Sequence, residues 1–208
     1  MEKGGQQEFA DADCSNQVEG KGKYGHVEIK AGAQTAAEFT NEEGAGLPKF
    51  EGEIAGVKAE ILCGAAKGTE NIENVNAAPM SISGTSVIID FTECVPVGAL
   101  ATDGCSVQAA EITIENTSNK TVQDTMEVEF TTVLGNFGLV RLKGCKTPAL
   151  NGAFSLKGTM RAIASGALLT FTQESTKGLE LAGSPASLTA TLTLKMTGGN
   201  AISYTTTN

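Results

Sequence analysis

Aromatic side chains and histidine are scarce in this chain of 208 residues. It contains no Trp, two Tyr and a single His, and aromatic residues make up 5% of it. Catalytic triads need a base, which is usually histidine, and sugar sites commonly stack the sugar ring on Trp or Tyr. His26 lies in the strand-like run 24–28 and is interpreted as a solvent-facing structural residue. We therefore expect no nucleophilic triad.

Clusters of positive charge and long hydrophobic segments are also missing. The formal net charge is −9, and residues 1–80 hold 7 Lys and Arg against 14 Asp and Glu. Nucleic acids and anionic lipids are bound by clustered Lys and Arg, so we expect neither as a partner. The longest apolar run, near 95–101, has about seven residues, whereas a membrane-spanning helix needs about 20. A membrane span is not expected.

Motifs for cofactors and metal ions are absent as well. The sequence has no phosphate-binding Gly-Lys-Ser/Thr loop, no dinucleotide fingerprint, no CxxC pair and no Cys/His zinc set. Asp11, Asp13 and Asn16 offer oxygen ligands for calcium, but the glycine and the distal glutamate of an EF-hand are missing. We expect no cofactor and no metal-binding residue.

Paired carboxylates are the remaining candidates for catalysis, because glycosidases use two of them. The nearest pairs are Asp90 with Glu93 and Glu127 with Glu129. Only proximity in the sequence supports them, and solvated strand faces are the better explanation. We predict no catalytic residue and no enzymatic activity, and we keep a hydrolase with dispersed carboxylates as an alternative.

The strongest pattern in the chain is an alternation from Leu188 to Met196. Leu188, Ala190, Leu192, Leu194 and Met196 alternate with Thr189, Thr191, Thr193 and Lys195. Successive side chains of a strand point to opposite faces, so this pattern predicts a sheet with one buried and one solvated face. The predicted fold is all-β: an antiparallel β-sandwich or barrel-like arrangement of the jelly-roll type, with many short strands.

Other strand-like runs are bounded by glycine. They cover residues 24–30, 34–40, 49–55, 57–63, 80–83, 86–91, 106–116, 125–133, 138–142, 153–162, 168–173, 178–181, 187–196 and 202–206. Only 59–66 and 162–169 could form a helical turn. Glycosylation sequons at Asn116 and Asn119 are expected to mark an exposed turn. We predict a loosely ordered N-terminal segment, 1–20, and a single β-sandwich domain, 21–208.

Four of the five cysteines, Cys63, Cys94, Cys105 and Cys145, lie where a strand-like run meets a turn. This placement favours disulfides, and of the three possible pairings we favour Cys63–Cys94 with Cys105–Cys145. The alternative is that all are reduced core residues of an intracellular protein. Cys14 is a free thiol, an intermolecular link or a partner for one of the other four.

We expect no signal peptide in this sequence, because Met1 is followed by the polar run Glu-Lys-Gly-Gly-Gln-Gln. The chain is then either cytoplasmic or a mature secreted domain whose leader is absent from this sequence. The cysteines favour the second interpretation, so we predict an extracellular or cell-surface location.

The last third of the chain has motifs that point to a family. Residues 166–172 are followed by 179–194, in which a Gly-Ser-Pro-Ala-Ser-Leu-Thr turn leads into a Thr/Leu strand, and Gly-Cys pairs stand at 104–105 and 144–145. Over roughly residues 50–206 the chain resembles uncharacterised secreted proteins of soil actinobacteria. In them Gly is usual where Ala190 stands here, and Cys14 has no counterpart. The resemblance implies secretion and an all-β fold, and it transfers no catalytic residue.

The leading functional hypothesis is a non-enzymatic structural or interaction protein, secreted or held on a cell surface. Its partner would be another copy of itself, in a homo-oligomer or filament, or a cell-surface component. Strands 187–196 or 202–206 could pair with another chain if they lie at a sheet edge. A glycan-binding or small-ligand-binding β-sandwich module is the alternative, followed by the hydrolase.

Overall fold

The structure is a computed structural model, and it describes residues 10, 16, 18, 32–42, 44–75, 81–122 and 125–197. Most of the predicted N-terminal segment 1–20 lies outside the described residues. Cys14, His26 and the predicted strands 24–30 and 202–206 lie outside them too.

Antiparallel strands make up most of the described chain. They are β1 (Gln34–Asn41), β2 (Lys49–Ile54), β3 (Val57–Leu62), β4 (Ala65–Val75), β5 (Ser81–Thr92), β6 (Val95–Val97), β7 (Ser106–Val107), β8 (Glu111–Thr121), β9 (Glu127–Thr132), β10 (Gly138–Lys143), β11 (Gly152–Ser165), β12 (Leu168–Phe171), β13 (Leu179–Leu181) and β14 (Ser184–Met196). A short helix, α1 (Gly98–Thr102), and 3₁₀ turns at Gln108–Ala110 and Pro148–Leu150 complete the elements. The predicted all-β class is confirmed. No helix in the described ranges has the length and apolar character that a membrane crossing requires.

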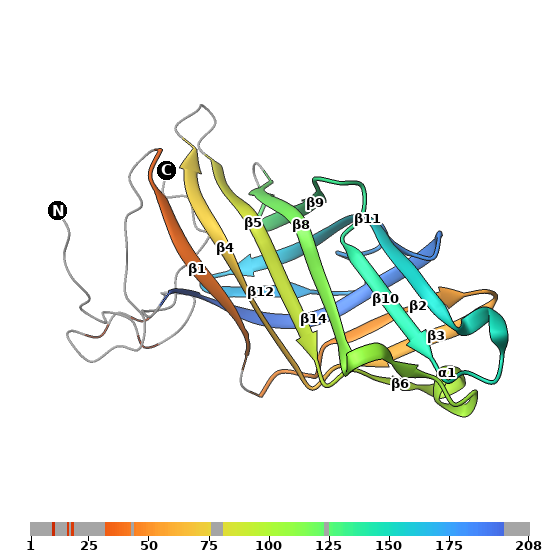
Figure 1. Cartoon of the computed structure of the whole chain (residues 1–208). Coiled ribbons are helices and arrows are strands. Elements are labelled where there is room, and N and C mark those ends of the chain that lie inside the picture. The colour runs from red at the N-terminus through yellow and green to blue at the C-terminus, as the bar shows by residue number, and fades with distance from the viewer. Residues whose placement is uncertain are drawn as a thin grey trace.

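Eight of the described strands form a closed hydrogen-bonded circuit. From β14 the order is β1, β4, β5, β8, β9, β11 and β12, and β12 pairs with β14 again. Figure 1 shows β1, β4, β5 and β8 side by side, with β14 crossing behind them. Because the circuit closes, none of its eight strands is left as a free edge of the circuit.

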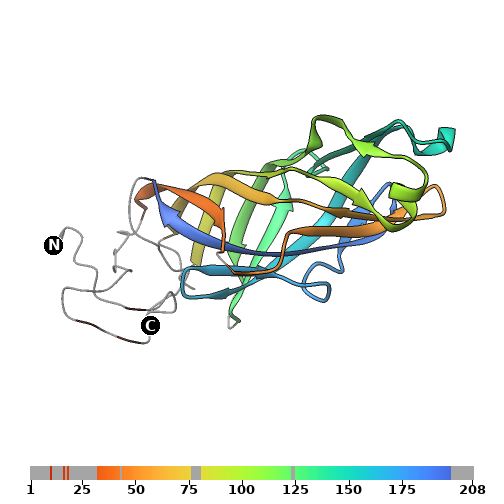
Figure 2. The same ribbon diagram turned by 90° about the horizontal axis from the view of Figure 1, so that it is seen from below.

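β11 and β14 continue beyond the circuit and pair there with further strands, which we call the extension. β2, β3 and β6 continue from β14, and β10 and β7 continue from β11. β13 pairs with both long strands and joins the two sides of this extension. In Figure 2, β14 runs along the molecule, beside β1 at one end and β2 at the other. The helix α1 joins β6 to β7 at the extended end (Figure 1).

One hydrophobic core fills the circuit and continues beneath the extension. Alternate residues of β14 from Leu188 to Leu194 are at most 3% exposed, as the period-2 pattern predicts. The rings of Phe130 and Phe171 lie 5.3 Å apart inside the circuit. Phe50 of β2 meets Phe91 of β5 edge-on at 4.9 Å. This second contact packs the extension against the circuit.

The opposite face of β14 is solvated at Thr189 and Lys195, as predicted, and differs from the prediction at Thr193. Thr193 is only 4% exposed, and its hydroxyl donates to the Glu42 carboxylate. β14 also pairs on both sides, with β1 and β2 along one edge and β12 and β13 along the other. Residues 187–196 therefore do not lie at a sheet edge, and the condition for pairing with another chain is not met there.

Four segments differ from what the sequence analysis expected or left open. β4 was not predicted, because its inward positions Ala66, Gly68 and Glu70 are small or polar and give no hydrophobic alternation. Segment 59–66 belongs to β3 and β4, and 162–169 belongs to β11 and β12, so neither forms the helical turn allowed for it. The apolar run near 95–101 contains α1, whose Leu100 is fully buried.

A polar pair is buried inside the circuit. Asn119 of β8 donates from Nδ2 to Oε2 of Glu70 at 2.6 Å, and the two residues are 3% and 2% exposed. Gly84 of β5 lies between them, and a Cβ at Gly84 would stand 2.3 Å from Glu70 Oε2. Only glycine leaves room for this contact. Because Asn119 lies on a strand and is buried, the expectation that its sequon marks an exposed turn is wrong.

Candidate functional site

A hollow lies on the outer surface where the turn 172–178 faces β9 and β11, and we call it the Arg161 groove. Its volume is about 420 Å³, within the range of small-ligand sites. It is lined by Glu127, Thr159, Arg161, Ile163, Thr172, Glu174, Ser175, Lys177 and Gly178. Among the described residues, the lining combines charged groups and hydroxyls and includes no aromatic side chain.

The turn 172–178 occupies a gap between β12 and β13 along β11. β12 pairs with residues 163–165 of β11, and β13 pairs with residues 156–158. Between them, Thr159 N–H donates to the Gly178 carbonyl and Arg161 N–H donates to the Ser175 carbonyl, both at 3.0 Å. A Cβ at Gly158 would lie 2.1 Å from the Gly178 carbonyl oxygen. Glycine at position 158 therefore allows the turn to approach β11 closely.

The hydroxyl of Thr176 fills the same gap along β14. Thr176 is fully buried, and its Oγ1 accepts the Leu188 N–H at 3.0 Å. The same oxygen lies 2.7 Å from the Thr172 carbonyl and 3.1 Å from the Leu188 carbonyl, either of which can accept its proton. No described strand pairs with Leu188 on this side, and the Thr176 hydroxyl takes the place of a strand's backbone groups there. It gives the buried Leu188 N–H the acceptor that it would otherwise lack.

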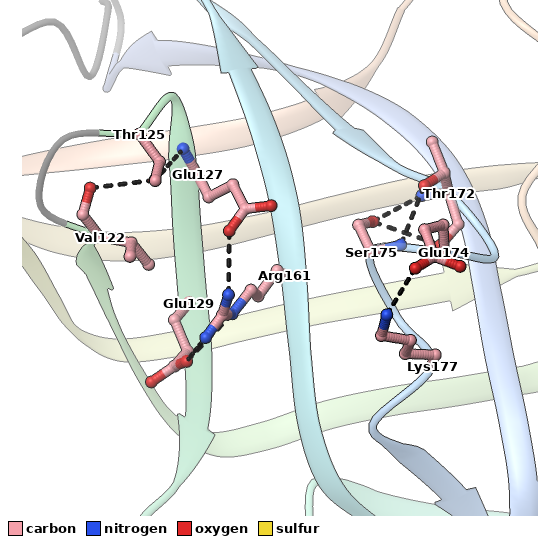
Figure 3. Close-up of polar contacts among 9 residues, drawn as sticks. All are labelled: Val122, Thr125, Glu127, Glu129, Arg161, Thr172, Glu174, Ser175 and Lys177. Atoms are coloured by element: carbon pink, nitrogen blue, oxygen red, sulfur yellow. Dashed lines mark hydrogen bonds and ion pairs between the residues drawn. The ribbon is translucent and has the colours of Figure 1, made fainter.

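Two further hydroxyls fix the shape of the turn itself. Ser175 Oγ accepts the Thr172 N–H at 2.9 Å, and Thr172 Oγ1 accepts the Ser175 N–H at 3.1 Å. Figure 3 shows these contacts beside the Glu174–Lys177 ion pair, whose atoms lie 2.5 Å apart. The wall of the groove formed by the turn is therefore held by reciprocal hydrogen bonds.

The facing wall carries a network of ion pairs between β11 and β9, which we call the charge fork. Arg161 of β11 lies directly opposite Glu129 of β9 in the register and donates to its Oε2 from Nε and Nη2, at 3.1 and 2.8 Å. Its Nη1 donates to Glu127 Oε2 at 3.0 Å (Figure 3). The hydrogen bond to Glu129 is the largest influence that raises the pKa of Arg161. One guanidinium therefore orients two carboxylates along the edge of the groove.

A second hollow, of about 590 Å³, lies on the other side of the same turn. Gln173 reaches across it to donate to Glu51 Oε2 of β2 at 2.5 Å. Lys49 forms ion pairs with Glu51 at 2.8 Å and with Glu60 at 3.3 Å. The hydrogen bond to Lys49 lowers the pKa of Glu51, and the same bond raises the pKa of Lys49. Lys177 lines both hollows, so the turn forms a ridge between them.

The predicted carboxylate pairs have different surroundings. Asp90 accepts the Thr113 hydroxyl at 2.8 Å, and neither Asp90 nor Glu93 lines the two hollows described above. Glu127 and Glu129 do lie together, but both are bound by Arg161. A general acid needs a carboxyl group that keeps its proton, which an apolar pocket provides. Glu127 and Glu129 instead lie against the Arg161 guanidinium at the surface and not in an apolar pocket.

The cysteines tie the segment of residues 94–107 at both ends. Cys63 is bonded to Cys94 and Cys105 to Cys145, the two pairs that the sequence analysis favours. Asp103, in the same segment, accepts the N–H and the hydroxyl of Thr147 at 2.9 and 2.8 Å. These two bonds lower the pKa of Asp103.

Sequence reasoning missed Arg161, Thr176 and the turn as parts of a site. The available signal was weak: Arg161 occupies an outward position on a predicted strand, and Glu127 and Glu129 share one face of another. Nothing in the sequence says that these two strands are neighbours. Comparison with known proteins finds no matching family model, no similar curated protein and no similar solved structure.

Proposed function

We propose that this chain is a non-enzymatic, extracellular interaction protein that holds a neutral, hydroxyl-rich ligand, such as a cell-surface glycan, in the Arg161 groove. The observation that carries the proposal is the pairing of the charged groups in the groove: Arg161 binds Glu127 and Glu129, and Lys177 binds Glu174. Both cations that line the groove, Arg161 and Lys177, are already bound by carboxylates, so an anionic ligand would have to displace an existing ion pair. A neutral ligand can bind to the remaining donor and acceptor sites without doing so.

The rigidity of the walls supports the same proposal. The turn is held by the buried Thr176 hydroxyl and by the reciprocal Thr172–Ser175 bonds, so its polar atoms are already positioned before a ligand arrives. Preorganisation lowers the entropic cost of binding. Because none of the described lining residues offers an aromatic ring for stacking, we expect weak affinity, with Kd on the order of 1 mM.

The test is a titration with neutral hexasaccharides of glucose and of N-acetylglucosamine, followed by amide chemical shifts in ¹⁵N-labelled protein. We expect shifts confined to Glu127 and to residues 159–163 and 172–178, which line the groove. Arg161→Gln should weaken binding at least about tenfold, which corresponds to ~1.4 kcal/mol. Arg141→Gln, on the exposed face of β10, is the matched control and should bind as the parent does.

Self-association is the second candidate, and one observation favours it. Val133 and Leu134, in the connection between β9 and β10, are 67% and 69% exposed. Adjacent exposed apolar side chains are a common feature of protein contacts. Light scattering across protein concentration tests this candidate: a particle mass that rises for the parent and not for Val133→Ser/Leu134→Ser supports it. A constant mass near 21.4 kDa rejects it.

A further inference from the structure

We propose that reduction of the Cys105–Cys145 disulfide converts this position into a binding site for Zn²⁺ or a similar divalent metal, with Asp103 as the third ligand. The ligand atoms of these three residues all lie within 4.8 Å of one another, a grouping found nowhere else among the described residues. While the two sulfurs are bonded to each other, neither is a thiolate that can bind metal. The site therefore depends on the redox state.

The spacing of the three side chains suits tetrahedral zinc. With Zn–S bonds of about 2.3 Å and Zn–O bonds of about 2.1 Å, two sulfurs lie about 3.8 Å apart and a sulfur and a carboxylate oxygen about 3.6 Å apart. The Cys105 Sγ is already 3.9 Å from Asp103 Oδ2. Two thiols that are no longer bonded move apart to nearly the required distance by van der Waals contact alone. Water would take the fourth position, as it does in zinc sites with three protein ligands.

The loop that contains Asp103 and the loop that contains Lys146 and Thr147 stay together without the disulfide, because hydrogen bonds join them. Lys146 N–H donates to the Asp103 carbonyl at 2.9 Å, and Thr147 donates twice to the Asp103 carboxylate. Ser106 Oγ donates to the Lys143 carbonyl at 3.2 Å, where β7 pairs with β10. The reduced thiols would therefore remain side by side in the folded protein.

The surroundings of Asp103 favour its role as a ligand. Thr147 donates to both of its oxygens, which fixes the orientation of the carboxylate in the way that outer hydrogen bonds orient metal ligands. The neighbouring Lys146 donates from Nζ to the Thr102 carbonyl at 3.2 Å and is not bonded to Asp103 through its side chain.

Exposure makes the reduction selective. Cys105 and Cys145 are 8% and 9% exposed, whereas Cys63 and Cys94 are 0% and 1% exposed. A dithiol reductant in solution would transfer two electrons and two protons to the Cys105–Cys145 bond and itself become a disulfide. Metal binding would then release the two thiol protons to solvent. The fully buried Cys63–Cys94 bond would hold the rest of the segment in place.

The experiment uses the full chain with Cys14→Ser, so that Cys14 cannot bind metal. The protein is reduced with a dithiol under native conditions, the reductant is removed without oxygen, and Co²⁺ is added as the probe. We expect one Co²⁺ per chain with the ultraviolet absorption of cobalt–thiolate bonds, displaced by Zn²⁺. Alkylation and mass spectrometry should show Cys105 and Cys145 modified and Cys63 and Cys94 still bonded.

The variant Asp103→Asn decides the role of the carboxylate. It should weaken Co²⁺ binding at least about tenfold, while Asp90→Asn, outside the cluster, leaves it unchanged. Absence of cobalt–thiolate absorption, binding by Asp103→Asn as tight as by the parent, or loss of the β-sheet circular dichroism on reduction would each overturn the proposal.

Discussion

Two surface segments of this protein are held in place by different means. Residues 94–107 are tied at their ends by Cys63–Cys94 and Cys105–Cys145, whereas the turn 172–178 is held by the hydroxyls of Thr172, Ser175 and Thr176. A disulfide acts mainly by restricting the unfolded chain. A buried hydroxyl acts in the folded state by satisfying backbone groups. The first segment therefore contributes to the stability of the whole molecule, and the second sets the shape of the groove.

The largest expected effect is the loss of the buried disulfide. Cys63→Ala/Cys94→Ala opens a link between residues separated by 31 positions, so we expect a loss of about 4 kcal/mol in the free energy of unfolding. Urea denaturation followed by circular dichroism measures it. Cys105→Ala/Cys145→Ala should cost less, because Thr147 still donates two hydrogen bonds to Asp103 and because these two cysteines are less deeply buried than Cys63 and Cys94. Equal losses in the two double variants would contradict this difference.

Loss of the Thr176 hydroxyl in the turn 172–178 should lower the free energy of unfolding by a smaller amount. Thr176→Val keeps the shape of the side chain but leaves the Leu188 N–H buried without its acceptor, which should cost about 1–3 kcal/mol. Thr176→Ser is the matched control, because it keeps the hydroxyl and loses only a methyl group. The amides of residues 172–178 should exchange with solvent faster in Thr176→Val than in Thr176→Ser. The same exchange rate in both variants would show that the hydroxyl does not hold the turn.

The charge fork should contribute little to stability. The side chain of Arg161 is 45% exposed, and ion pairs in such positions are typically worth less than about 1 kcal/mol. We expect Arg161→Gln to change the urea midpoint only slightly while weakening ligand binding in the groove. A large loss of stability would mean that Arg161 is structural, and its effect on binding would then say nothing about the groove.

The smallest expected effect is a pH dependence of stability caused by Asp103, in the segment 94–107. The folded pKa of Asp103 lies below its ordinary value of 3.8, so its contribution is present above that pH and is lost as the pH falls through the lower folded pKa. Below about pH 4, the stability of the parent should therefore approach that of Asp103→Asn. Urea midpoints of both proteins measured across this range provide the test. A constant difference between them would contradict the assignment.

Sequence patterns were sufficient for the strands with one apolar face. The alternation in Leu188–Leu194 predicts β14 and its buried residues, and glycine-bounded runs predict β2, β3 and β10 closely. The same reasoning missed β4, where small and polar residues face inward. It also left Thr193 on the solvated face, because a local pattern does not show that Glu42 covers it. Hydrophobic alternation detects a strand only when its buried face is apolar.

The sequence by itself determined the all-β class, the inward residues of the amphipathic strands and the scarcity of groups for nucleophilic catalysis. These follow from the period of the side chains along one strand and from composition, which are local properties. Only the tertiary structure decided that the circuit closes, that Arg161 lies opposite Glu129, and that the Thr176 hydroxyl completes the ladder of β14. Register and strand order depend on contacts between segments far apart in the chain, and such contacts leave no period in either segment alone.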